Sequence, residues 1–313
     1  MEKGEAHMFG RRADGRRLDN IDPIVQIMPY LMTQRNDAMN MLTLYLDYDP
    51  IMEYIKKRSL EGKKVSFMSL IVAAFVRAVA EYPELNRFVM NKQIFARNVI
   101  NVSLTVLRNQ GDKKNMDEAT VKMEYEPDAT LFEVSEQMDA LVKEATDPKA
   151  GNDTVDFVKK LLKMRWLING VVAFARFTDR YGLLPKFIYD VSPFHCSMFI
   201  TNMSSIGLPG IYHHLYNFGN TTVFIALGKF ERQPVFGKDG VTYKNVIPLG
   251  IVTDERICGG ASYAQGFNYF KKLLQNPELL EQRPDHINED FDFSALRAKR
   301  KAKKAQKENK KNA

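Results

Sequence analysis

The sequence predicts an α+β domain in which a mixed sheet carries helices on one side. Strand-like segments stand at both ends of the chain and helix-like segments fill the middle, an order typical of layered α+β folds. The 313 residues are 45% hydrophobic, which is enough to bury one large core. We therefore expect one domain over residues 23–285, between a loose segment at 1–22 and a basic tail at 286–313 that we expect to be disordered.

The first half of the chain begins with a strand and two helices. Residues 39–47 alternate in polarity, and Asp49-Pro50 opens a helix that runs to about residue 60, because proline fits the first helical position. Residues 66–81 are apolar nearly all round, which predicts a buried helix that ends before Pro83. Further expected strands are 88–90, 93–95, 99–107 and 120–126, followed by a helix at 131–145.

The second half changes from helical to strand-rich sequence. Helical segments are expected from residue 153 to about 181. Beyond Pro185 four strands are expected, and Lys238-Asp239-Gly240 is the hairpin turn between the last two. These strands are 197–202, 222–229, 231–236 and 241–254, followed by a helix at 261–274 and one more turn at 276–280.

The basic character of the chain is confined to its end. The net charge is +7, yet residues 297–313 contain nine Lys/Arg and one Glu, a net of +8, so the rest of the chain carries −1. This tail has no apolar periodicity, which is typical of a solvated end. Contact with nucleic acid through the tail is the alternative, and no interleaved aromatic residue strengthens it.

Composition gives no sign of a membrane span, a metal site or a disulfide framework. The longest apolar stretch, 67–80, is interrupted by Arg77 and is shorter than the ~20 residues that a spanning helix needs. Residues 1–20 lack the apolar core of a signal peptide, so we expect a cytoplasmic protein. Cys196 and Cys258 belong to no CxxC or Cys/His cluster, and we expect both to be buried thiols.

Residues 254–261 read Asp-Glu-Arg-Ile-Cys-Gly-Gly-Ala and lead into the last expected long helix. They resemble the signature Asp-His-Arg-x-x-Asp-Gly-Ala, which marks the catalytic domain of the 2-oxoacid dehydrogenase dihydrolipoyl acyltransferases and the chloramphenicol acetyltransferases. Four more segments resemble this family in its own order, namely 82–86, 199–203, 223–235 and 273–280. The resemblance reaches from about residue 40 to 280, whereas the region 110–190 fits it poorly.

The resemblance implies a two-layer, chloramphenicol-acetyltransferase-like domain that assembles as a homotrimer, with active sites at the subunit boundaries. It further implies coenzyme A or an acyl-CoA as co-substrate, a small-molecule thioester as partner, and no metal. No lipoyl domain precedes residue 20, so we expect no covalent lipoate. Coenzyme A binding in this family has no compact motif, and its contacts stay unassigned.

Two positions of the family's catalytic machinery map onto this chain. Thr201 stands at the position of the hydroxyl that stabilises the oxyanion, and Glu255 replaces the catalytic His. A free Glu has a pKa near 4.3 against about 8.5 for a thiol, so proton transfer is uphill by roughly 6 kcal/mol, about twice the cost for an imidazole. Burial can raise the pKa of a Glu and narrow that gap. The alternative is a polar residue at a vacated site, ion-paired with Arg256.

Gly259 replaces the Asp that holds the loop under the site in the family, and Gly259-Gly260 permits unusual backbone angles or close approach. Two readings follow: an acyltransferase that uses Glu255, or a non-catalytic trimeric pseudoenzyme that binds thioesters or serves as a scaffold.

The remaining polar candidates are weighed by position. His213 and His214 follow the Thr201 strand and are the alternative bases, with surface or capping roles favoured. His195 lies six residues before Thr201, ~20 Å along a strand and too far to share a proton with it. Asp254 should point away from Glu255, so the two carboxylates are not expected to form a pair.

Overall fold

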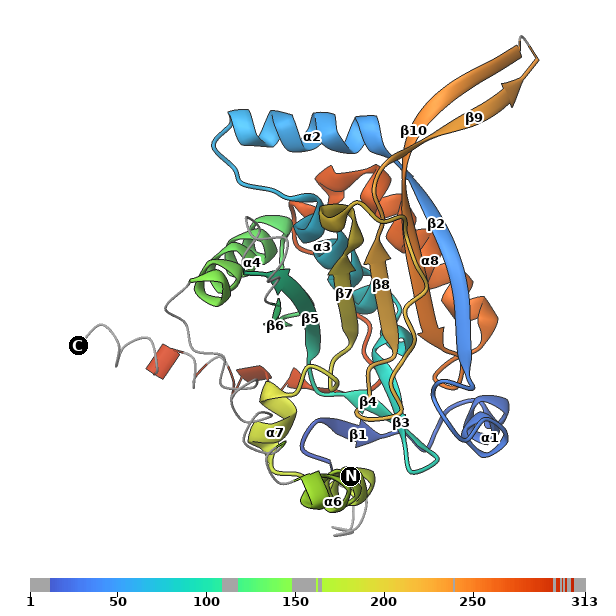
Figure 1. Ribbon diagram of the computed structural model, residues 1–313, viewed down its shortest axis with the longest axis vertical. Helices are drawn as coiled ribbons and strands as arrows, with labels where there is room; N and C mark the ends of the chain where they lie inside the picture. Colours follow the sequence, from blue (N-terminus) through green and yellow to red (C-terminus); the bar gives the residue numbers. More distant parts are fainter. Residues whose placement is uncertain are drawn as a thin grey trace.

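The computed structural model describes residues 12–108, 118–147, 162, 165–238, 240–294, 297–298, 300, 302 and 305–306. Its centre is a seven-stranded mixed sheet with the order β2-β10-β8-β7-β5-β6 and β9 paired to β10 (Figure 1). Strand β7 runs parallel to both neighbours, β5 and β8, and the other pairs are antiparallel. The strands are β2 (Met39–Asp47), β5 (Ile100–Leu107), β6 (Glu118–Tyr125), β7 (Met198–Asn202), β8 (Val223–Leu227), β9 (Glu231–Gly237) and β10 (Gly240–Asp254).

Three long helices cover one face of this sheet: α3 (Phe67–Glu81), α4 (Leu131–Thr146) and α8 (Gly260–Gln275) (Figure 1). Helix α3 begins at Ser66, whose hydroxyl accepts from the Ser69 amide in a capping box, and almost all of its side chains are buried. Met198, Ile200 and their neighbours on adjoining strands face these helices and form the main core. The predicted α+β architecture, with helices on one side of a mixed sheet, is confirmed.

Most element bounds agree with the sequence prediction to within two residues. Helix α2 (Tyr48–Leu60) begins before Asp49, so Pro50 is its third residue rather than its first. Strands β3 (Arg87–Met90) and β4 (Gln93–Arg97) form a second sheet with β1 (Gly15–Arg17). Short 3-10 turns stand at Pro83–Asn86, Met203–Ile206 and Pro277–Leu280. In the part of the chain that the structure describes, no helix is both long and apolar enough to span a bilayer.

Both ends of the domain differ from the sequence prediction. Residues 12–22 are not loose: β1 pairs with β4, and Arg12 is only 3% exposed. An unpredicted helix, α1 (Pro23–Leu31), follows directly, capped by Asp22. Residues 286–294 are not disordered either, because Asp290 binds the Arg87 guanidinium through two hydrogen bonds and Phe293 is buried. The charge of the individual residues does not show which of them form ion pairs in the folded chain.

The opposite face of the sheet carries a smaller apolar cluster and a covering loop. Phe199 of β7 and Phe224 of β8 pack there with Leu215, which comes from the loop 207–222 between the two strands. The loop touches the sheet main chain to main chain: a Cβ on Gly228 would stand 2.1 Å from the Gly210 nitrogen. Glycine is therefore required where this loop rests on the sheet.

Helices α6 (Arg165–Arg180) and α7 (Lys186–Val191) lie at one end of the molecule, beside β1 (Figure 1). Helical segments were expected from residue 153 to about 181, of which 153–161 and 163–164 lie outside the described residues. Most of α6 is exposed, including Trp166 and Phe174, but its Asp179 is buried. Asp179 accepts a hydrogen bond from Arg12, so one ion pair fastens α6 to the N-terminal strand.

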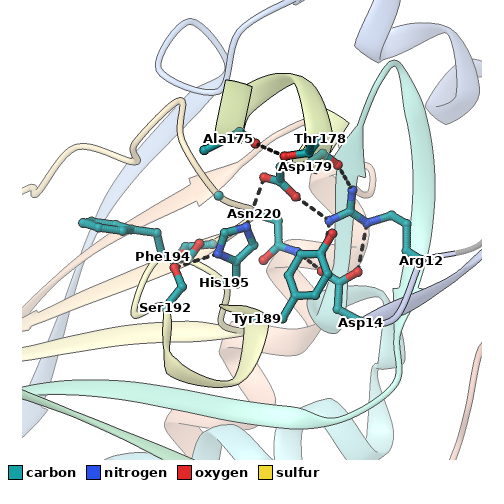
Figure 2. Close-up of polar contacts among 12 residues, drawn as sticks. Arg12, Asp14, Ala175, Thr178, Asp179, Tyr189, Ser192, Phe194, His195 and Asn220 are labelled. Atoms are coloured by element: carbon teal, nitrogen blue, oxygen red, sulfur yellow. Dashed lines mark hydrogen bonds and ion pairs between the residues drawn. The ribbon is translucent and has the colours of Figure 1, made fainter. Parts of the chain in front are cut away.

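His195 extends this contact into the body of the protein. Its Nε2 lies 3.0 Å from Asp179 Oδ2, and its Nδ1 lies 2.7 Å from the Ser192 hydroxyl (Figure 2). A carboxylate only accepts, so Nε2 donates to Asp179. Burial lowers the pKa of His195 and favours the neutral ring, whose Nδ1 then accepts from the Ser192 hydroxyl. His195 is only 1% exposed. Its contacts join α6 to the residues that follow α7, so we assign it a structural role.

We expect this network to make the fold sensitive to acid. Burial lowers the pKa of His195, although Asp179 opposes the shift. Burial alone would raise the pKa of Asp179, but His195 and Arg12 bring it below its usual value. Both folded pKa values lie below the unfolded ones, so the stabilisation is complete at neutral pH and is lost on acidification, first through His195 from about pH 6.5 and then through Asp179 from about pH 3.9.

The measurement is the melting temperature of the parent and of His195→Asn between pH 8 and pH 5. The variant should melt lower at pH 8 and show a flatter pH dependence below pH 6.5. His286→Asn, at an exposed site, is the control and should keep the parental slope. A parental slope in His195→Asn would show that another group causes the acid sensitivity.

Candidate functional site

A cavity of about 660 Å³ lies where β7 and β5 end, between the covering loop, α3 and α4. Its wall is largely apolar, with Leu104 and Val106 of β5, Met138 of α4 and Phe199 of β7 among its residues. The other described residues of the lining that matter here are Thr201, Met203, His213, Tyr216, Phe224, Glu118 and Asp139. A concave, mainly apolar wall that also carries polar side chains is the usual form of a small-molecule site.

Thr201 lies in this cavity, where β7 gives way to the turn at Met203–Ile206. The alternation of side chains along β7 explains this position. Met198 and Ile200 face the helices, so Phe199 and Thr201 face the opposite side of the sheet. The Thr201 hydroxyl lies 3.8 Å from the Met203 sulfur, a weak acceptor. The hydroxyl is therefore able to donate to a ligand oxygen.

His213 also lines the cavity and approaches it from the covering loop. Its ring stacks on Phe224, with centroids 4.1 Å apart and planes 4° apart. Phe224 stacks in turn on Phe199, which is two residues before Thr201 on β7. The structure thus brings a sequence alternative, His213, onto the same sheet face as the expected oxyanion donor.

Glu255 is not among the described residues that line the cavity. It is partly exposed in the turn after β10, and its amide donates to the Ala38 carbonyl. Within one chain the structure therefore does not bring together the two residues that sequence analysis assigned to catalysis, Thr201 and Glu255. Arg256, which was the alternative ion-pair partner of Glu255, binds Asp254 instead.

Asp254 is the centre of a buried ion cluster. Arg256 donates to both of its oxygens, at 2.8 and 2.7 Å, and Arg35 Nε lies 3.3 Å from Oδ2. Arg35 also donates to the carbonyls of Tyr216 and Gly219, so the cluster ties the end of β10 to the loop that carries His213. Asp254 points inward, away from Glu255, as expected. Sequence analysis missed Arg35, since nothing in its local sequence marks a buried partner more than 200 positions away.

Gly259 and Gly260 serve a simpler purpose than sequence analysis suggested. Gly259 is the N-cap of α8 with φ −71° and ψ 160°, a conformation open to any residue. Neither glycine has positive φ, and a Cβ at either would meet nothing within 4 Å. The two glycines permit unusual angles or close approach, but the structure uses neither.

Gly259→Asp should stabilise the protein. An Asp at the N-cap accepts from the first amides of the helix and places a negative charge at its positive end, together worth about 0.3–1 kcal/mol. Urea unfolding of the parent, Gly259→Asp and Gly259→Ala measures the effect. The Ala control lacks an acceptor and should be less stable than the parent; a gain in both variants would point to chain entropy rather than capping.

The remaining candidate groups do not converge on the cavity. Cys196 and Cys258 are buried free thiols, as expected, and burial raises the pKa of Cys258 to about 12. His214 is exposed, and its ring stacks on that of His213. Within the described ranges, no group of three or more His, Cys, Asp or Glu side chains is placed to hold a metal ion.

Comparison with known proteins gives a consistent result. The family model described as 2-oxoacid dehydrogenases acyltransferase (catalytic domain) matches residues 24–112 and 196–281, more than half of the chain. The lipoamide acyltransferase component of the branched-chain alpha-keto acid dehydrogenase complex of Caenorhabditis elegans is 24% identical over 255 residues, 78% of this chain and 44% of that protein. The component of the same name from Arabidopsis thaliana is 37% identical over 57 residues, 18% of this chain and 12% of that protein. This chain thus spans less than half the length of either relative.

Solved structures agree on the fold. The cubic core of the pyruvate dehydrogenase multienzyme complex superposes with a TM-score of 0.53 at 13% identity, covering 84% of this chain and 94% of that one. A probable dihydrolipoamide acetyltransferase from Listeria monocytogenes gives 0.51 at 12% identity, with 83% and 94% covered. A chloramphenicol acetyltransferase gives 0.50 at 11% identity, with 83% and 99% covered. The segment 113–195, which contains α4, α6 and α7, lies between the two regions that the family model matches.

Proposed function

Because the chain belongs to the family of 2-oxoacid dehydrogenase acyltransferase catalytic domains, we propose that it transfers an acyl group from an acyl-CoA thioester to an acceptor in the cavity beside Thr201. The observation that carries this proposal is the position of Thr201. Its hydroxyl lies at the cavity, 3.8 Å from the Met203 sulfur, a weak acceptor, and can donate to the oxygen of an attacked carbonyl.

The wall of the cavity indicates which part of the thioester it receives. Its described residues include Glu118 and Asp139 but neither Lys nor Arg, so they offer no cation to the phosphates of coenzyme A. Its apolar surface suits the acyl group and the sulfur instead. We expect the thioester carbonyl beside Thr201 and the nucleotide outside the described wall. Neither a metal nor covalent lipoate is part of the proposal.

A homotrimer is also part of the proposal. Glu255, at the family's base position, lies away from the cavity of its own chain, so it can act only if a second copy brings it to the Thr201 cavity. Exposed apolar residues on the N-terminal helix and on the edge strand β2, including Ile24, Leu31 and Met41, are suited to contact between copies. Intracellular action on acyl-CoA in the cytoplasm fits the expected localisation and stays a prediction.

The second candidate is a thioester-binding protein without turnover. It is favoured by one observation: Asp254 and Arg256, two residues of the signature, are used in a buried structural cluster, while the base position holds Glu255. The two functions share the ligand and differ in chemistry.

Formation of free coenzyme A from short- and medium-chain acyl-CoAs, with dihydrolipoamide as acceptor, separates these candidates, and calorimetry with the same acyl-CoAs measures binding. Turnover supports the transferase, and binding without turnover supports the alternative. If no acyl-CoA binds, both functions lose their ligand.

A further inference from the structure

Of the described residues that line the cavity, His213 alone carries a side chain whose ordinary pKa lies near neutral pH. It belongs to the same chain as Thr201 and needs no second copy to reach the site. The family's signature does not include this position, and its base position is held by Glu255. To accept a proton, His213 must be held in place with one ring nitrogen unprotonated.

The main chain that carries His213 is fixed on the sheet. A Cβ on Gly250 would stand 2.1 Å from the Ile211 carbonyl oxygen, and a Cβ on Gly228 would overlap Gly210 in the same way. The Lys229 amide also donates to the Leu208 carbonyl at 2.9 Å. These contacts fix residues 208–211 of the loop on the sheet, just before His213.

The ring is held in one orientation. It lies flat on Phe224, and its Nδ1 is 3.2 Å from the His214 carbonyl oxygen. A carbonyl only accepts, so this contact places the proton on Nδ1 and leaves the lone pair on Nε2. Nε2 with a free lone pair is the form that removes a proton from a nucleophile.

The surroundings keep the ring neutral. Burial is the main cause that lowers the pKa of His213; the carbonyl contact opposes the shift and the nearby His214 adds to it. The other titratable groups near the ring or in the cavity wall are Tyr216, at 5.9 Å between ring centroids, and Glu118 and Asp139. At neutral pH the base form is therefore the populated one.

We infer that His213, acting in the same chain as Thr201, takes the proton of the acceptor in place of the residue at the signature's base position. This inference rests on the proposed acyltransferase function. The acceptor thiol attacks the thioester carbonyl carbon and passes its proton to Nε2, while the carbonyl electron pair moves to the oxygen that Thr201 stabilises. The tetrahedral centre then expels the coenzyme A sulfur, which takes the proton back from the imidazolium.

The test is the rate of coenzyme A release by the full chain for the parent, His213→Asn, His214→Asn and Glu255→Gln. Loss of a general base costs about 10²–10⁴-fold, so His213→Asn should lose at least a hundredfold of kcat/KM while calorimetry still shows acyl-CoA binding. His214→Asn, at the exposed neighbour, is the control and should stay near the parental rate, and Glu255→Gln measures the contribution of the signature's base position. Added imidazole should restore part of the rate to His213→Ala, a rescue that a merely structural role would not give.

The outcomes are distinct. A His213→Asn rate within about threefold of the parent, or a loss in Glu255→Gln with none in His213→Asn, overturns the inference while the proposed function stands. A parent with no turnover overturns both. If His213 variants unfold at the assay temperature, the pH profile of the parent decides: kcat/KM should fall as pH drops below about 6.5 in both the parent and Glu255→Gln, and a flat acidic limb would overturn the assignment.

Discussion

Asp254→Ala is expected to lower the free energy of unfolding by about 3–5 kcal/mol, the usual cost of removing one partner from a buried ion pair. Asp254 is fully buried, and its loss leaves the guanidinium groups of Arg35 and Arg256, on side chains at most 5% exposed, without their carboxylate. Such a loss is a large part of the stability of an ordinary domain. Urea unfolding followed by circular dichroism measures it.

Two matched variants make this prediction sharp. Asp254→Asn keeps the shape and one acceptor oxygen but removes the charge, so it should fall between the parent and Asp254→Ala. Glu255→Gln, at the next position, removes a charge from a partly exposed residue and should change stability by less than about 0.5 kcal/mol. Equal effects at positions 254 and 255 would show that the cluster contributes little.

Thr201→Val is expected to reduce kcat of acyl transfer by about 10²–10³-fold, as the loss of one oxyanion donor does in other acyl-transfer sites. Valine keeps the branched shape of Thr201 on β7, so the wall of the cavity should be preserved while the only change is the hydroxyl. Coenzyme A release under saturating acyl-CoA is the measurement.

The control for this prediction is Thr201→Ser, which retains a hydroxyl and should keep most of the activity. Acyl-CoA affinity should be similar in all three proteins, because the hydrogen bond strengthens in the transition state rather than in the ground state. Parental activity in Thr201→Val would remove the hydroxyl from the mechanism and leave the proposed oxyanion donor unassigned.

Much of the fold could be predicted because it follows from short-range patterns. The alternation in residues 39–47 gave β2 its correct bounds, and the continuous apolar run at 67–80 gave the buried helix α3. The strands expected at 88–90 and 93–95 are β3 and β4, and Asn91 and Lys92, both with positive φ, form the turn between them. Helix α1 was missed, because Pro29 inside it interrupts the usual helical pattern.

The candidate site could be predicted only in part, because its geometry depends on contacts between distant segments. The side of β7 on which Thr201 lies follows from strand parity, and its place in the cavity fits that parity. The contacts of Asp254 with Arg35 and of Arg12 with Asp179 join residues far apart in the chain, and no local pattern encodes such pairs. The position of the His213 loop on the sheet likewise depends on Gly250 of β10 and on Gly228, which follows β8.

The close contact of the covering loop with the sheet main chain limits how the substrate preference of this protein could change. At Gly228 and Gly250 the loop rests on the sheet with no side chain between the two main chains, so any larger residue would lift the loop from its place. Variation in the acyl group or the acceptor would then have to arise from residues that project into the cavity, such as Met138 and Val106, and not from rerouting of the loop. The backbone path of the loop over the sheet would then stay the same while the side chains of the cavity wall change the substrate preference.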